Sequence, residues 1–228
     1  MSPFLETVTV LLVIALGITL GHKMSRLKKP YWLAGYCFAL TLILLLIAAR
    51  IYPQLSFFAP LSWIILGRAK FVTLAFAVTL GVTAPLSKLT RSSTRIAFCS
   101  AMAVTLFYFS VMPFFAPAIL EHDISRLRTR INAHGICFQT TDFTCGPAAA
   151  VTAITQMGLH AEEGHIAVLA RSSPVSGTLP ACLAGAIQKQ YGSHGITSRY
   201  DHFNSLDQLT SADFSLAIIK SSLDRKST

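Results

Sequence analysis

Cys145 is the residue of this sequence whose type and position most clearly suggest chemistry. It lies within QTTDFTCGP (residues 139–147), and the next stretch, 148–157, carries three alanines followed by apolar residues at three-residue spacing. That spacing predicts a helix, and Pro147 suits its first turn. The N–H groups and the dipole at a helix N-terminus favour an anion, and a thiolate is one. Cys145 is therefore a candidate nucleophile.

Gln139 is a second candidate for the same site, because it lies six residues before Cys145 on the approach to the helix. Its side-chain amide can donate a hydrogen bond to an oxyanion beside the sulfur, and one such donor is worth roughly 3–4 kcal/mol. Asp142 or Thr144 can cap the helix. Spacing alone leaves two roles open for Cys145, nucleophile or packing residue, because an unpaired cysteine is often only a packing residue.

The pattern of helices and strands expected around these residues indicates an α+β domain over residues 134–228. A solvated connecting helix over 121–133 is expected to precede it. We expect an extended run at 133–138, helices at 148–157, 162–170, 179–191 and 205–209, and strands at 196–201 and 214–220. Helices that come first and strands that come later favour this fold class.

Residues 1–120 have the composition of a membrane region. Hydrophobic residues make up 53% of the chain and charged residues 13%, which excludes a disordered protein. A helix that crosses a bilayer needs about 20 apolar residues. We predict an all-α transmembrane bundle with four spans, near 4–21, 31–51, 71–86 and 96–120. A fifth run, 55–67, is too short to cross and is expected to be interfacial or re-entrant.

Two alternative interpretations of these apolar segments are disfavoured. A cleaved signal peptide is disfavoured for the first span, because no Lys or Arg precedes it and no small-residue cleavage site follows it. A buried helical core of a soluble protein is disfavoured because a run as apolar as 38–49 has no polar face. We therefore predict an integral, multi-pass membrane protein whose first helix is retained.

The net charge of +9 raises the question of nucleic-acid binding, but much of the Lys and Arg lies in short runs beside apolar stretches. Such runs set membrane topology, and we expect no nucleic-acid partner. Loop 22–30 carries four basic residues and loop 87–95 carries three, so both should be cytoplasmic. Four spans then place the C-terminal domain outside the cytoplasm, at a plasma or bacterial inner membrane. An odd number of spans would reverse this orientation.

The segment QTTDFTCGPAAAV (139–151) resembles the nucleophile motif of the double-glycine-leader, or bacteriocin-processing, cysteine peptidases. Gly158-Leu159 after the first helix, Ala161-Glu162-Glu163 at the second and Gly177-Thr178 before the third also resemble that family, in register. The resemblance covers residues 134–220 and none of the membrane part. It implies a papain-like cysteine-peptidase domain, Cys145 as nucleophile, Gln139 as oxyanion-hole donor, and a peptide or protein substrate.

The family's catalytic His follows a strand that 214–220 resembles, yet residues 221–228 contain no His. His160, His165, His194 and His202 do not match that position, and His160 and His165 are expected to be surface residues. A nucleophile without its base loses on the order of 10⁴–10⁶ in rate. Three alternatives stay open: a domain incomplete at its C-terminus, a degenerate and non-catalytic peptide-binding or scaffold relative, or a His supplied by a partner chain.

The other four cysteines have ordinary interpretations. Cys37 and Cys99 lie in apolar spans as packing residues, whereas Cys137 and Cys182 can pair with each other in an oxidising compartment, or Cys137 with Cys145. No spacing of His, Cys or acidic residues indicates a metal site, and no glycine-rich phosphate loop is present. We therefore expect neither a metal nor a cofactor.

Overall fold

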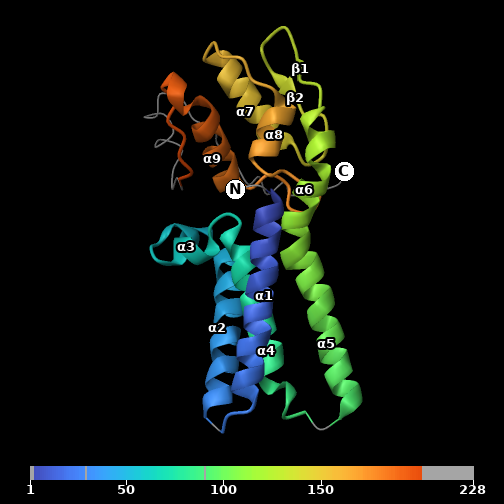
Figure 1. The fold of residues 1–228 in the computed structure, drawn as a ribbon. Coiled ribbons are helices and arrows are strands. Elements are labelled where there is room, and N and C mark those ends of the chain that lie inside the picture. The colour runs from blue at the N-terminus through green and yellow to red at the C-terminus, as the bar shows by residue number, and fades with distance from the viewer. Residues whose placement is uncertain (1–2, 29, 90, 202–228) are drawn as a thin grey trace, which may run out of the picture.

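The computed structural model describes residues 3–28, 30–89 and 91–201, and these residues are mostly helical. In this part of the chain, four helices are long and apolar enough to cross a membrane. They are α1 (Pro3–Ser25), α2 (Tyr31–Ile51), α4 (Ala69–Leu86) and a continuous helix over Ser92–Ser125, which comprises α5 (Ser92–Leu106), a π-helical turn (Phe107–Val111) and α6 (Met112–Ser125) (Figure 1). The four predicted spans are confirmed as helices.

Helix α4 forms the centre of the bundle and packs against both α1 and α2. Helices α1 and α4 approach closely where Gly17 and Gly21 face Thr79 and Thr83, because a Cβ on either glycine would collide with the facing threonine hydroxyl. Small residues four apart allow helix backbones to approach closely in a bilayer, where van der Waals packing drives association. This Gly-x-x-x-Gly contact was not predicted from the sequence.

The two basic loops lie together at one end of the bundle. The Ser87 hydroxyl, just after α4, donates a hydrogen bond of 2.8 Å to the Ser25 carbonyl at the end of α1. The N-terminus of α1 lies at the opposite end, beside the C-terminal domain (Figure 1). The charge asymmetry that was predicted from sequence is therefore an asymmetry between the two ends of the folded bundle.

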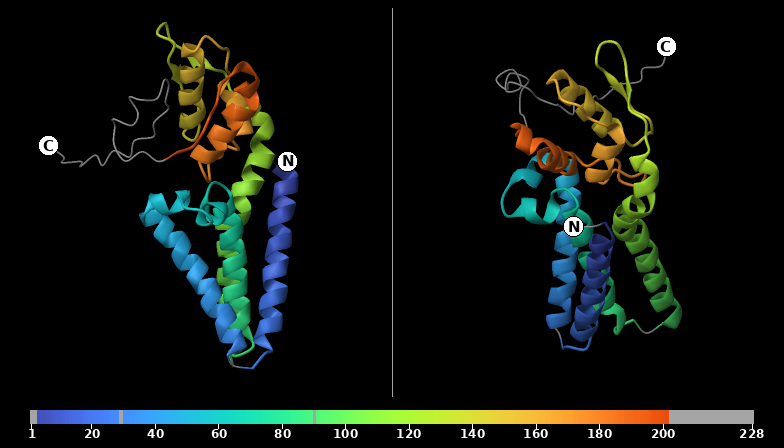
Figure 2. Two further views of the ribbon diagram at one scale, coloured as in Figure 1. Left: turned by 90° about the vertical axis from the view of Figure 1, so that its left-hand side faces the viewer. Right: turned by 45° about the horizontal axis from the view of Figure 1, so that its top comes forward.

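The short run between α2 and α4 does not form a spanning helix. It contains a 3-10 turn, η1 (Pro53–Phe57), and the single-turn helix α3 (Leu61–Ile65), which project sideways at the end of the bundle nearest the domain (Figures 1 and 2). Its Trp63 side chain is 78% exposed, and Tyr52 and Phe58 are each 63% exposed.

The C-terminal domain begins with a minimal hairpin and continues as three helices. Strands β1 (Arg130–Ile131) and β2 (Cys137–Phe138) pair antiparallel, with Ile131 opposite Cys137. The helices are α7 (Cys145–Gln156), α8 (Glu163–Leu169) and α9 (Pro180–Tyr191), followed by the turn η3 (Gly192–His194). Apolar side chains from all these helices and β2 form one core, which includes Cys137, Ala148, Val151, Ile154, Ile166, Leu183 and Tyr191.

Three expectations for this domain need correction. The connecting helix predicted over 121–133 ends at Ser125, because α8 packs there: a Cβ on Gly164 would lie 2.6 Å from the Ile124 carbonyl oxygen. Residues 196–201 form no strand, and the Ser198 N–H instead donates to the Gln188 side chain at 2.8 Å. A papain-like α+β fold is not confirmed, since the described domain has only two short strands. The elements expected at 205–209 and 214–220 lie outside the described residues.

Candidate functional site

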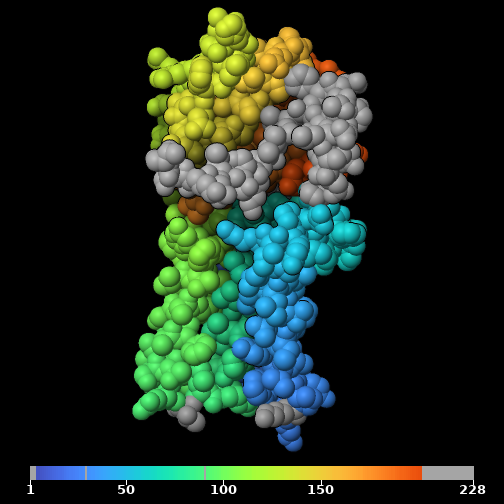
Figure 3. Space-filling view, turned by 180° about the vertical axis from the view of Figure 1, so that it is seen from behind, coloured from blue at the N-terminus to red at the C-terminus, as the bar shows by residue number. Residues whose placement is uncertain are grey.

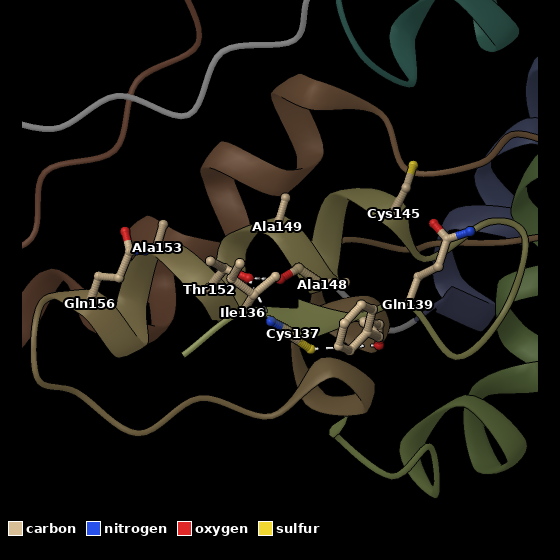
Figure 4. Close-up of a pocket in the computed structure, with 10 residues that line it drawn as sticks. Ile136, Cys137, Gln139, Cys145, Ala148, Ala149, Thr152, Ala153 and Gln156 are labelled. Carbon is tan, nitrogen blue, oxygen red and sulfur yellow. Dashed lines mark hydrogen bonds between the residues drawn. The ribbon is translucent and has the colours of Figure 1, made fainter. Parts of the chain in front are cut away.

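A groove of about 420 Å³ runs along one face of α7, between that helix and strand β2. Two of its lining residues are Gln139 and Cys145, the two site residues predicted from the sequence. The others are Ile136, Cys137, Phe138, Ala148, Ala149, Thr152, Ala153 and Gln156 (Figure 4). Small alanine side chains on α7 leave this face open, and residues 136–138, which include strand β2, line the opposite side.

Cys145 is the first residue of α7, and its side chain is exposed. Thr144 occupies the N-cap position, but no side chain caps the first N–H groups of the helix. The buried Thr144 hydroxyl turns back instead and contacts the Thr141 hydroxyl at 3.0 Å. The capping predicted for Asp142 or Thr144 is therefore wrong, and the helix presents uncapped N–H groups next to the Cys145 thiol.

Gln139 lies at the same end of the groove as Cys145 (Figure 4). Its side chain is exposed, and the figure shows the amide group on the side where the Cys145 sulfur lies. The short loop 140–144 separates the two residues and reverses the direction of the chain. The structure thus brings together the two site residues that were predicted from sequence.

A buried carboxylate fixes this loop. Glu163, the first residue of α8, is fully buried. It accepts hydrogen bonds from the Thr140 N–H at 2.8 Å and from the Thr140 hydroxyl at 2.6 Å. The Glu163 N–H in turn donates to the Thr129 hydroxyl at 2.9 Å. Because Thr140 follows Gln139 directly, Glu163 anchors the backbone that carries the amide.

From the sequence, Glu163 was expected only at the start of a helix. An acidic residue in a first turn is common because it complements the helix dipole. Its burial shows that it also anchors the loop, since a buried carboxylate without hydrogen-bond partners is very unfavourable. Burial is a property of the folded domain, so it was not visible in the residue pattern.

Cys137 connects the floor of the groove to α7. Its N–H donates to the Thr152 hydroxyl at 2.9 Å, which holds β2 against the helix. Its thiol is buried, and this burial, together with the nearby Glu163 carboxylate, raises the pKa of Cys137. All five cysteines lie in the described part of the chain and are free thiols, so neither predicted pairing is present.

The histidines of the described residues do not line the groove. His160, His165 and His194 are all exposed on the domain surface, as was expected for the first two. His202 lies outside the described residues. No cluster of His, Cys, Asp and Glu suited to a metal ion is found in the portion that the structure describes.

Comparisons with known protein families, with characterised proteins and with solved structures found no significant match to this chain. The chemical interpretation of the groove therefore depends on its own geometry. An exposed thiol at uncapped helix N–H groups can act as a nucleophile, and a neighbouring amide can stabilise an oxyanion.

Proposed function

We propose that this chain is a membrane-anchored cysteine peptidase, which cleaves peptide bonds with Cys145 as nucleophile. The observation that carries the proposal is the placement of the exposed Cys145 thiol and the Gln139 amide at one end of the same groove. The resemblance of residues 139–151 to the double-glycine-leader peptidases supports the same assignment. The four apolar helices support a multi-pass anchor.

In the proposed reaction, the Cys145 thiolate attacks the carbonyl carbon of the substrate, and the carbonyl oxygen becomes an oxyanion. Gln139 and the Cys145 N–H donate hydrogen bonds to that oxygen. The carbon–nitrogen bond then breaks, and the amine leaves with a proton from a general acid. Water hydrolyses the resulting thioester, which releases a carboxylic acid and returns the thiol. His202 is the first residue to test as the acid and base.

The groove contains two glutamines, which provide a matched pair of variants for a test of the oxyanion role. Gln139 is near Cys145, and Gln156 is near the far end of α7. We expect Gln139→Ala to slow acylation of Cys145 by an activated peptide ester about 10²-fold, the value of one lost oxyanion donor. Gln156→Ala should slow it less than threefold. Equal effects of the two substitutions would overturn the oxyanion assignment.

A non-catalytic peptide-binding module is the second candidate. The observation that favours it is the exposed apolar wall of the groove, where Ile136 is 45% and Phe138 57% exposed. Such side chains beside a short strand suit an extended peptide. Under this alternative, Cys145→Ala leaves peptide affinity unchanged and no variant hydrolyses peptides. Hydrolysis that is lost in Cys145→Ala excludes it.

The orientation of the anchor is part of the proposal. Both basic loops lie at the end of the bundle away from the domain, and positively charged loops stay in the cytoplasm. We therefore place the domain and the groove outside the cytoplasm, at a plasma or bacterial inner membrane. The substrate would then be a peptide or protein on that side.

A further inference from the structure

The C-terminal domain rests directly on the membrane region. Figure 3 shows the surface of the segment that contains η1 and α3 immediately beneath the domain. Ring centroids of Phe57 and Tyr200 lie 5.1 Å apart, and the Arg171 guanidinium, in the loop before α9, lies 3.9 Å from the Glu6 carboxylate on α1. Contacts from two parts of the membrane region, η1 and α1, thus hold the domain close to the bundle.

Two features indicate that the surface of the bilayer lies at the domain end of the helix bundle. Glu6 also forms an ion pair with Arg68, and Arg68 donates to the Pro113 carbonyl at 3.0 Å. Charged groups are costly in the hydrocarbon layer, so this pair belongs near its edge. The exposed Trp63 of α3 lies at this end of the bundle, and Trp is enriched at membrane–water interfaces.

A short chain of contacts connects this level to the nucleophile. A Cβ on Gly67, two residues before α4, would lie 3.6 Å from the Ala181 Cβ in the first turn of α9. A Cβ on Gly146, next to Cys145, would lie 3.3 Å from the Leu183 side chain in that same turn. Gly67 and Gly146 therefore both lie close to the first turn of α9, which places Cys145 near the end of α4 that faces the domain.

The groove extends away from the membrane from this point. The Tyr191 hydroxyl at the far end of α9 donates to the His160 carbonyl, just beyond the end of α7, at 3.1 Å. Helices α7 and α9 therefore run in the same direction, with their N-termini towards the bilayer (Figure 1). Since α7 has 12 residues and an α-helix rises about 1.5 Å per residue, the Gln156 end lies roughly 16 Å from the Cys145 end.

From this arrangement we propose that the substrate is a membrane-tethered polypeptide whose scissile bond lies at the bilayer surface. The inference rests on the proposed function and adds the substrate class. A chain anchored by a lipid or a transmembrane segment is concentrated at the depth of Cys145, whereas its distal residues follow the groove outward towards Gln156. A free peptide has no such advantage.

The depth of the thiol is tested without reference to catalysis. The full chain, with its other four cysteines replaced by alanine, is labelled with a bimane at Cys145 and placed in nanodiscs whose lipids carry a headgroup nitroxide. A matched variant carries the same label at Q156C in a Cys145→Ala background. We expect quenching at least twofold stronger at position 145. Equal quenching, or stronger quenching at position 156, overturns the proposed depth.

The substrate class is tested with the unmodified chain in plain phosphatidylcholine nanodiscs. A chloroacetyl peptide is presented either free or linked to a diacyl lipid, and adduct formation at Cys145 is followed by peptide mass mapping. We expect the anchored peptide to react at least tenfold faster at equal total concentration. Equal rates of adduct formation by the two peptides overturn the tethered-substrate proposal but do not contradict the proposed peptidase function. Failure of both peptides, while iodoacetamide still reacts at Cys145, overturns the proposed function itself.

Discussion

The carboxylate of Glu163 accepts two hydrogen bonds from Thr140, one from its backbone N–H at 2.8 Å and one from its hydroxyl at 2.6 Å. The two residues are 23 positions apart, yet their contact joins α8 to the loop that carries Gln139 and leads to Cys145. Through it, the core of the domain determines where the amide of the candidate site lies.

Replacement of Glu163 by alanine should therefore damage both stability and reactivity. The Thr140 N–H and hydroxyl would both lose a carboxylate acceptor, at a cost of about 1.5–3 kcal/mol, and Gln139 would lose its anchor. We expect a lower thermal midpoint in detergent and slower acylation of Cys145 by an activated peptide ester. Glu162→Ala, at the exposed neighbour, is the control. A Glu163→Ala protein with unchanged acylation would contradict the positioning role.

The helix bundle provides a second prediction, at Gly21. A leucine at this position would collide with Thr83 on α4, because even a Cβ does so. Overpacking of this kind costs about 1–3 kcal/mol. We expect Gly21→Leu to lower the thermal midpoint, measured by tryptophan fluorescence in nanodiscs. As a control, Leu20→Ile at the exposed neighbouring position should leave the thermal midpoint unchanged. Equal thermal midpoints for both variants would argue against the close α1–α4 contact.

The cysteines provide a prediction about pH. Burial raises the pKa of the Cys182 thiol, although the nearby Arg68 partly opposes this, and burial also raises the pKa of Cys137. A raised pKa leaves less thiolate at neutral pH, so both should be alkylated more slowly than the exposed Cys145 at pH 7. Their rates should still increase above pH 9, where a free thiol has largely ionised. Uniform rates at pH 7 in a mass-mapped alkylation series would be inconsistent with this structure.

Topology is tested by reporter fusions after Glu121, at the domain end of the last span. The proposed orientation predicts that alkaline phosphatase fused there is active, because that enzyme folds outside the cytoplasm. A cytoplasmic reporter at the same position should be inactive. The reverse pattern would place the groove in the cytoplasm.

The membrane helices could be predicted from sequence because composition alone determines them. A run such as 38–49 has no polar face, so no other environment suits it. The helix that begins at Cys145 was similarly evident, from Pro147 and the apolar spacing behind it. The nearness of Gln139 and Cys145 followed from the short loop that joins them.

The remaining features depend on contacts between distant residues. The threonines opposite Gly17 and Gly21 lie on another helix, and the partner of Glu163 lies on another loop. The connecting helix ends early because Gly164 brings α8 against Ile124. Residues 196–201 have strand-like composition, but a strand also needs a neighbouring strand, and the described domain places none beside them. The pattern of residues within one segment does not show which distant residues will contact it.

The central claim is that Cys145 is the nucleophile of a peptide-cleaving site. It is tested most directly by the intact mass of the full chain after brief reaction with an activated peptide ester, followed by peptide mapping. We expect a single thioester adduct on Cys145, absent in Cys145→Ala and retained in Cys182→Ala. An adduct on Cys137 or Cys182 instead, or no adduct on a Cys145 thiol that still reacts with iodoacetamide, would contradict it.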